Sequence, residues 1–275
     1  MKTYYFIIAA VCFAACSNSK NSKSAVQNNQ HIQKSEFQSI LDSAQVTGAI
    51  LIYDLQKNSY YSNNFDWANK GQLPASTFKI PNSIIALETG VVANDSTLFK
   101  WDGQKRSFKV WEQDLILREA FHFSCVPCYQ DVARQIGEQR MKAYLHKLDY
   151  GNIKVDASNI ALFWLQGDSR ISPFQQIEFL KRFYTAALPI SARTSAIMKR
   201  LMLIEETEHY KISGKTGLSD ANGKYNGWFV GYLETEGKVY FFATNVEPSP
   251  QTDMEQFSTV RKAATYQALK QFDNK

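Results

Sequence analysis

The sequence predicts an α/β (α+β) fold, in which helices flank one mostly antiparallel, five-stranded sheet that a helical insert interrupts. Two strand patterns come first, helical patterns dominate residues 76–206, and three strand patterns with a closing helix come last. Strands that follow one another through short turns pair antiparallel, which is the reason for expecting this kind of sheet. We find no internal repeat, and the length of 275 residues suits one large domain.

The first half of the domain begins as a hairpin and continues as helices. Residues 49–54 and 59–61 are strand-forming stretches on either side of a polar turn, which is typical of a hairpin. Apolar residues at helical spacing then predict helices over residues 139–148, 173–187 and 192–205.

The second half returns to strands. Strand patterns occupy residues 210–216, 227–234 and 239–245, and Glu236-Gly237 supplies a hairpin turn between the last two. A final helix is predicted over about residues 253–272.

The N-terminus has the pattern of an export signal. Lys2 precedes an apolar run over residues 4–13, which is too short to span a bilayer as a mature helix. Small residues then precede Cys16, as in bacterial lipoprotein signals, so residues 1–15 are predicted to be a signal peptide and Cys16 a lipidated first residue. Phe13 departs from the usual leucine at its position, so ordinary signal-peptide cleavage is the alternative.

This signal predicts a protein of the periplasm of a Gram-negative bacterium, anchored to the membrane only through the lipid. Residues 16–34 are rich in Ser, Asn, Gln and Lys, and are expected to form a flexible tether because they carry too little apolar surface to fold. Residues 35–275 remain as the folded domain.

Composition describes an ordinary globular protein, with 44% hydrophobic residues, 21% charged residues and a net charge of +5. The basic residues are scattered without a Lys/Arg-rich run, which argues against nucleic acid as a partner. The mild positive balance is compatible with an anionic small-molecule substrate. The four histidines show no paired metal-ligand spacing, so no metal is expected.

The stretch Ser76-Thr77-Phe78-Lys79 is the strongest chemical signal in the chain. It places a hydroxyl and an amine three residues apart, directly before an apolar-periodic segment over residues 80–92. In a helix these two side chains share one face, where a desolvated lysine can take the proton of a serine nucleophile. Alone, S-x-x-K is weak evidence, because a capping serine and a solvated lysine give the same pattern.

Three further motifs follow in order. Ser124-Cys125-Val126 supplies a second hydroxyl, in a loop before a helix expected to begin near Gln130. Tyr150-Gly151-Asn152 is interpreted as a mainly structural turn, and Lys215-Thr216-Gly217 ends a predicted strand. Each tripeptide is uninformative alone, whereas the ordered set is specific.

With this set the sequence resembles the class D serine β-lactamases, the oxacillinase-type enzymes, whose signatures are STFK, SxV, YGN and KTG. The resemblance covers about residues 35–272. It extends to longer stretches at residues 74–83, to Pro127 with Tyr129-Gln130, and to residues 163–165, 214–217 and 227–232. It implies the fold that serine β-lactamases share with penicillin-binding proteins, and hydrolysis of β-lactam antibiotics through a serine acyl-enzyme, which confers resistance.

The resemblance implies a role for each catalytic residue. Ser76 is the nucleophile and Lys79, carboxylated on its amine by CO2 or bicarbonate, is the general base for acylation and deacylation. Ser124 relays a proton to the lactam nitrogen, Val126 walls the lysine pocket, and Trp164 donates its indole N–H to the carbamate. No other cofactor is implied.

A second group of residues is implied to bind the substrate. Lys215 and Thr216 bind its carboxylate, and Gly217 lets the strand backbone approach it closely. The main-chain N–H of Leu218, together with that of Ser76, forms the oxyanion hole. Arg261 grips the carboxylate with its guanidinium.

Several alternatives remain open at this point. A penicillin-binding D-Ala-D-Ala peptidase usually carries SxN, so Val126 argues against it, and β-lactam sensors that stay acylated follow a multi-helix membrane portion. Cys125 and Cys128 could be a redox or metal half-site, two small apolar residues or a short disulfide. None of the implied steps uses a thiol. The protein is expected to be a monomer or a homodimer.

Overall fold

The protein, seen here in a computed structural model that describes residues 1–2, 29–221 and 223–273, is built on a seven-stranded sheet with the order β1-β3-β2-β9-β8-β7-β6. Neighbouring strands are antiparallel, except for the parallel pair β1 and β3. The strands are β1 (Gln30–Gln33), β2 (Val46–Asp54), β3 (Ser59–Ser62), β6 (Leu203–Glu206), β7 (Tyr210–Ala221), β8 (Lys224–Thr235) and β9 (Lys238–Pro248). A separate two-stranded sheet joins β4 (Leu98–Phe99) to β5 (Leu115–Ile116).

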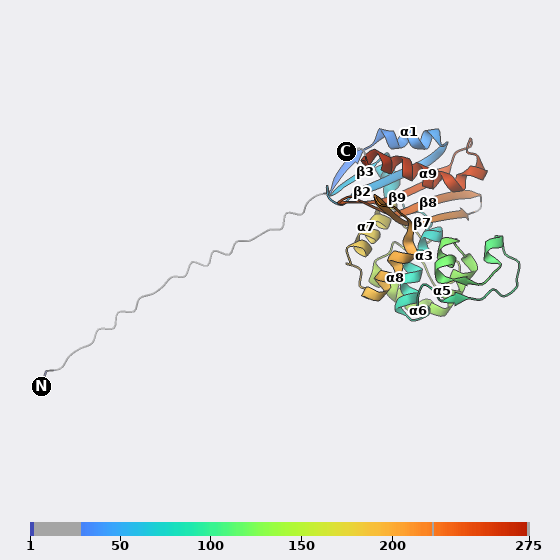
Figure 1. Ribbon diagram of the computed structural model, residues 1–275, viewed down its shortest axis with the longest axis horizontal. Helices are drawn as coiled ribbons and strands as arrows, with labels where there is room; N and C mark the ends of the chain where they lie inside the picture. The colour runs from blue at the N-terminus through green and yellow to red at the C-terminus, as the bar shows by residue number, and fades with distance from the viewer. Residues whose placement is uncertain (3–28, 222, 274–275) are drawn as a thin grey trace.

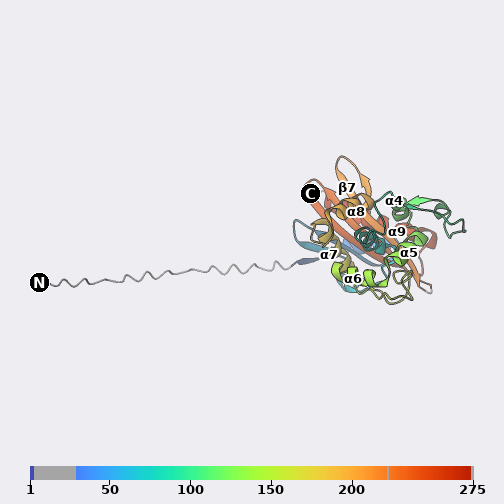
Figure 2. The ribbon, with the colours of Figure 1, turned by 90° about the horizontal axis from the view of Figure 1, so that it is seen from below.

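Helices cover both faces of the large sheet (Figure 1). One face carries α1 (Ser35–Ser43) and α9 (Met254–Asp273). The other carries a thicker helical layer, seen from below in Figure 2. Its α-helices are α2 (Phe65–Asn69), α3 (Lys79–Glu88), α4 (Leu117–His122), α5 (Val126–Ile136), α6 (Glu138–Leu148), α7 (Pro173–Tyr184) and α8 (Ala192–Met202), with 3-10 turns η1 (Ala75–Phe78) and η2 (Lys109–Trp111).

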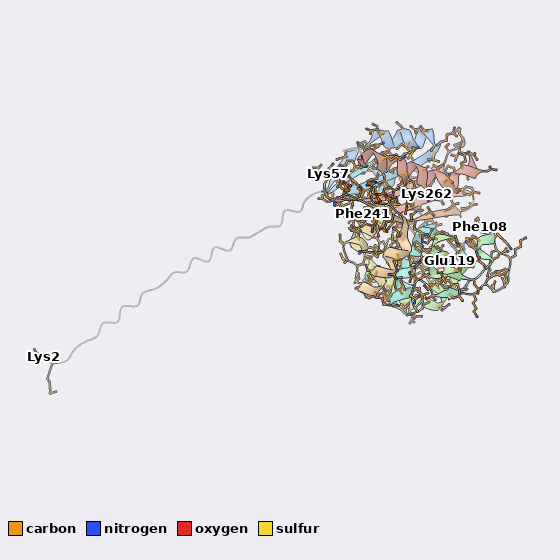
Figure 3. The ribbon with its side chains drawn as sticks, viewed as in Figure 1. Lys2, Lys57, Phe108, Glu119, Phe241 and Lys262 are labelled. Carbon is orange, nitrogen blue, oxygen red and sulfur yellow. A yellow bond between two sulfur atoms is a disulfide. The ribbon has the colours of Figure 1, made fainter. Side chains whose placement is uncertain are left out.

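This three-layer arrangement explains why the central strands read as nearly continuous apolar runs. A strand covered on both faces buries every side chain, so its sequence loses the apolar and polar alternation of a half-exposed strand. In β8 and β9 the residues from 226 to 233 and from 239 to 246 are all buried. Figure 3 shows Phe108 and Glu119 in the helical layer, whereas Lys262 lies on the α9 side.

Helix α3 is the centre of the helical layer. Its residues from Lys79 to Leu87 are all buried, so the helix is enclosed on every side rather than amphipathic. Pro81 is tolerated because it lies in the first turn, where its missing N–H has no intrahelical acceptor. The prediction of a helix directly after the S-x-x-K motif is confirmed.

The predicted antiparallel sheet with a helical insert is confirmed, but the strand count of five was wrong. Residues 203–206 were expected to end a helix, and instead they form β6 against the edge of β7. Helix α5 begins at Val126 rather than near Gln130, because Cys125 caps it by accepting the N–H of Cys128, and Pro127 lies in its first turn.

The predicted tether of residues 16–34 is too long at its C-terminal end. Residues 30–33 form β1, which pairs with β3, and the ring of His31 stacks on Phe65 and Phe174. Short polar stretches can join a sheet edge through main-chain hydrogen bonds, which composition does not reveal. The rest of the predicted signal and tether, with Cys16, lies mostly in residues 3–28, outside the described residues. Across the described ranges, no helix is long and apolar enough to cross a bilayer.

The buried carboxylate of Asp95 links two helices of the helical layer, α4 and α8. Asp95 is 6% exposed and pairs with Arg118 of α4 and Arg200 of α8. Hydrogen bonds from Arg200 and Arg118 lower the pKa of Asp95 to about 2. This ionised carboxylate therefore stabilises the fold at pH values above its ordinary pKa of 3.8, and the contribution is lost as the pH falls towards 2.

We expect Asp95→Asn to lower the free energy of unfolding by roughly 2 kcal/mol at pH 7, because the variant loses hydrogen bonds between charged groups. The difference from the parent should shrink as the pH falls below about 4. Urea unfolding of both proteins between pH 7 and pH 3 measures it. Asp131→Asn, which breaks an exposed pair with Arg134, is the control and should change little. A parent-like stability of Asp95→Asn at pH 7 would contradict the assignment.

Candidate active site

The start of α3 brings the hydroxyl and amine of the S-x-x-K motif into contact. Ser76 lies on η1 and Lys79 is the first residue of α3. The Lys79 Nζ donates a 3.0 Å hydrogen bond to the Ser76 Oγ. Ala75, with a φ of 50°, turns the chain into η1, and its N–H donates to the carbonyl of Trp164 at 2.8 Å. The predicted proximity of the two side chains is confirmed.

The environment of Lys79 is dry. Its side chain is 1% exposed, and burial lowers the pKa of its amine from 10.5 to about 7. A substantial fraction of the amine is therefore neutral at pH 7, which a general base requires. The Nζ also lies 5.0 Å from the ring centroid of Tyr129.

A chain of buried polar groups fixes η1. The Thr77 hydroxyl donates to the carbonyl of Pro74 at 2.6 Å and accepts from the Gln176 Nε2 of α7 at 2.9 Å. The Tyr150 hydroxyl donates to the Gln176 Oε1 at 3.3 Å, and the Tyr150 ring packs edge-on against Phe78. Tyr150 of the Y-G-N motif thus supports the serine-bearing turn from behind, as its structural interpretation expects.

The second hydroxyl meets the second lysine. Ser124 adopts a φ of 54°, a left-handed conformation that is rare for serine, and its Oγ accepts a hydrogen bond from the Lys215 Nζ. The same Nζ donates to the carbonyl of Thr216 at 3.0 Å. Burial, followed by the charges of Lys79 and Arg261, holds the pKa of Lys215 well below its usual range. Ser124 and Lys215 can therefore exchange a proton.

The exposed edge of β7 lies against η1. Strand β6 pairs with β7 only as far as Ser213, so the stretch from Gly214 onward is open on that side to the serine-bearing turn. A Cβ on Gly217 would lie 3.1 Å from the Thr77 Cγ2 and 3.2 Å from the Pro74 carbonyl oxygen. Glycine makes this approach possible without displacing η1, because both contacts would be tighter than usual for a Cβ. The next residue, Leu218, is 39% exposed at the mouth of the site.

Arg261 reaches the same edge from the α9 face of the sheet. It lies beneath Gly227, the cross-strand partner of Leu218, where a Cβ would be 3.5 Å from the Arg261 Cδ. The side chain is buried, and its Nε and Nη1 have no hydrogen-bond partner among the described residues. Burial lowers the pKa of Arg261 to about 10 and leaves it charged, so the site is suited to an anionic group.

Trp164 and Val126 complete the set of predicted residues. Trp164 is fully buried and stacks on Phe78, with the two ring centroids 5.6 Å apart. Its indole N–H has no partner in the described part of the chain. Val126 is partly buried at the start of α5, between Ser124 and Tyr129. The structure thus joins Ser76 to Lys79 and Ser124 to Lys215 directly, whereas Trp164 and Arg261 approach through intervening residues.

The sequence interpretation assigned no role to two residues that shape the site, Gln176 and Tyr129. Gln176 is 99 positions from Thr77, so no local pattern could reveal their contact. Tyr129 follows Val126 by three positions, and it would have been placed on the same helical face if α5 had been predicted to begin at Val126.

The two cysteines form a disulfide, which decides among the alternatives left open by the sequence. Cys125 and Cys128 are joined with their Cα atoms 5.5 Å apart, in the first turn of α5. No group of three or more potential metal ligands occurs among residues 29–221 and 223–273.

Comparisons with known proteins agree with one another. The family model described as "Penicillin binding protein transpeptidase domain" matches residues 13–270. β-Lactamase OXA-48 of Klebsiella pneumoniae is 43% identical over 224 residues, 82% of this chain and 83% of that protein. β-Lactamase OXA-10 of Pseudomonas aeruginosa is 40% identical over 250 residues, 90% of each chain. The crystal structure of the class D β-lactamase YbXI from Nostoc is similar with a TM-score of 0.81 and 41% identity, covering 85% of this chain and 97% of that one.

We expect the double variant Cys125→Ala/Cys128→Ala to lose at most about 2 kcal/mol of unfolding free energy, because the loop that the disulfide closes is very short. Urea unfolding of the variant and of the parent, with and without reductant, measures this difference. A loss as large as that of a long-loop disulfide would mean that the bridge maintains more than the first turn of α5.

Proposed function

The chain belongs to the class D β-lactamases, serine hydrolases that open the β-lactam ring through an acyl-enzyme, and we propose that Ser76 is the nucleophile of this reaction. The observation that carries the proposal is the 3.0 Å hydrogen bond from a buried Lys79 amine, with its pKa lowered to about 7, to the Ser76 Oγ. A serine hydroxyl attacks a carbonyl carbon only when a base accepts its proton, and Lys79 is the base in contact.

Acylation then uses groups on η1, α3 and β7, and on the loop before α5 that carries Ser124. Lys79 takes the proton as the Ser76 Oγ attacks the lactam carbonyl. The main-chain N–H groups of Ser76 and Leu218 stabilise the oxyanion, supported by the close packing of β7 on η1. As the C–N bond of the lactam breaks, Ser124 gives its proton to the nitrogen and takes a new proton from Lys215. The lowered pKa of Lys215 makes it a stronger acid than an ordinary lysine.

Substrate recognition is proposed for the same edge. β-Lactams carry a carboxylate, and Thr216, Lys215 and Arg261 form a cationic and hydroxylated border to receive it. The unpartnered Nε and Nη1 of Arg261 support this assignment, because a buried guanidinium without an acceptor is costly unless a ligand supplies one.

A carboxylated lysine is a general property of this class, and we propose that Lys79 carries one. Two features of this chain fit. A neutral Lys79 amine is accessible near pH 7, and the buried Trp164 indole N–H has no acceptor among the described residues, so an added carboxyl group could supply one. The added group would supply a carboxylate-type base for the serine and the hydrolytic water. Val126 would shield it from bulk solvent, and CO2 or bicarbonate is the only co-reactant required.

We also propose that the protein is exported to the periplasm of a Gram-negative bacterium and lipidated on Cys16. The apolar run over residues 4–13, followed by Ala14, Ala15 and Cys16, supports this. The anchor would leave a monomer or a homodimer acting on β-lactams that enter the periplasm, with resistance as the consequence.

The nucleophile can be tested by intact-mass measurement with a simple penicillin. We expect the parent protein to show a transient adduct and rapid hydrolysis, and Ser76→Ala to show neither. Ser39→Ala, an exposed serine of α1, is the matched control and should behave as the parent. An adduct that persists for hours in the parent would favour a sensor or a D-Ala-D-Ala peptidase, and an unaltered adduct in Ser76→Ala would rule out the nucleophile.

The role of Lys79 predicts a pH dependence. Because the reaction needs a neutral amine, activity should fall as the pH drops below about 7, and added bicarbonate should partly restore it near neutrality. Lys79→Ala should deacylate at least about a hundredfold more slowly than the parent, because the water loses its base. Steady-state and single-turnover kinetics measure both effects. Rapid turnover by Lys79→Ala, independent of bicarbonate, would refute the role.

A further inference from the structure

Tyr129 is a buried residue next to the proposed base, and none of the steps above uses it. Its ring on α5 is fully buried, and the Lys79 Nζ lies 5.0 Å from the ring centroid. At this distance a protonated amine is attracted to the negative face of an aromatic ring. The contact therefore acts on the same atom that must accept the serine proton.

Helix α3 holds Tyr129 at two points. The Tyr129 hydroxyl and the Ser83 Oγ share a 2.7 Å hydrogen bond, and the Asn82 Nδ2 donates to the Tyr129 carbonyl at 3.5 Å. Both partners lie one turn after Lys79 on α3, and the Cys125–Cys128 disulfide closes the turn of α5 directly before Tyr129. The ring is thus fixed relative to the lysine from both helices.

Within residues 29–221 and 223–273, no negatively charged group contributes to the pKa of Lys79. η1 contributes the neutral Ser76 hydroxyl, and β7 contributes Lys215, whose pKa is lowered in part by the charge of Lys79. Burial raises the pKa of Tyr129, so its phenol stays neutral. Among the described residues, the ring face is therefore the feature of this pocket that favours the ammonium form of Lys79, while burial opposes it.

We propose that Tyr129 is a positioning residue, which holds the Lys79 amine against Ser76 and sets the pH at which that amine combines with CO2. The inference rests on the proposed role of Lys79. In the reaction concerned, the ammonium first releases one proton to solvent. The neutral nitrogen then attacks the carbon of CO2: one C–N bond forms, one C=O bond becomes C–O⁻, one N–H bond of the amine breaks, and this second proton also goes to solvent. A ring that stabilises the ammonium delays this exchange to higher pH.

The test separates the contribution of the Tyr129 ring from that of the hydrogen bond between its hydroxyl and Ser83. Tyr129→Leu removes the ring, Tyr129→Phe keeps the ring but loses the hydroxyl, and Ser83→Ala removes the partner of the hydroxyl. Tyr184→Phe, which loses a 3.0 Å hydrogen bond to Glu234 at a distant site, is the matched control. The carbamate signal is followed by ¹³C NMR in ¹³C-bicarbonate as the pH is raised, with steady-state kinetics on a penicillin alongside.

We expect the midpoint of carbamate formation in Tyr129→Leu to move to lower pH by about half a unit to one unit, since the ammonium loses its aromatic partner. Its kcat should fall about tenfold with KM within about twofold, as misplacement of the base predicts. Tyr129→Phe and Ser83→Ala should keep the parent midpoint and lose about threefold in kcat. Tyr184→Phe should match the parent.

A parent-like midpoint and kcat in Tyr129→Leu would overturn the inference. If circular dichroism shows that Tyr129→Leu does not fold, Tyr129→Phe and Ser83→Ala decide: parent-like kcat in both would overturn the positioning role, and a shared loss with unchanged KM would support it. Failure of the proposed function is distinguishable, because it would appear as a penicillin adduct that survives Ser76→Ala.

Discussion

The burial of one amine is the constraint on which the rest of the site depends. Moving Lys79 out of water lowers the pKa of its amine from 10.5 to about 7, a change on the order of 5 kcal/mol in the balance between its charged and neutral forms. The fold supplies that burial by enclosing α3 on every side between the sheet and the other helices of its layer. A lysine at the same spacing from Ser76 on an exposed helix would remain protonated and could not accept the serine proton.

Burying one cation affects its neighbours. Lys215 shares the pocket, and the charge of Lys79 contributes to the depression of the pKa of Lys215. Two amines that repel each other do not both hold a proton easily, so they titrate as a coupled pair rather than as independent groups. This repulsion fits the opposite roles that we propose for them, in which the amine against Ser76 accepts a proton and the amine against Ser124 delivers one. The open edge of β7 makes this possible, because Gly217 lets the strand that carries Lys215 lie directly against η1.

The sequence predicted those parts of the site that depend on local spacing. The contact between Ser76 and Lys79 follows from their position on one turn, and the strand that ends in Lys215-Thr216-Gly217 follows from its residue types. Contacts between distant segments could not be predicted in this way. Gln176 is 99 positions from Thr77 in the sequence, yet the two side chains share a hydrogen bond. β1 and β6 are short edge strands held by main-chain hydrogen bonds, which leave no pattern in their side chains. The start of α5 at Val126 was also not predicted, because cysteine is an uncommon N-cap residue. The helical face on which Tyr129 lies therefore could not be assigned.

Trp164 and Arg261, both near the site, have buried N–H groups without a partner among the described residues, which indicates that the site binds anions. Buried polar atoms are normally satisfied, so each exception needs an explanation. The Trp164 indole N–H and the Nε and Nη1 of Arg261 are donors, and they lack an acceptor among the described residues. They also approach from opposite sides, since Trp164 packs on Phe78 within the helical layer whereas Arg261 extends from α9 on the other face of the sheet. The arrangement therefore fits the two anionic groups that we propose, a carboxyl group added to the buried Lys79 amine and the carboxylate of the substrate.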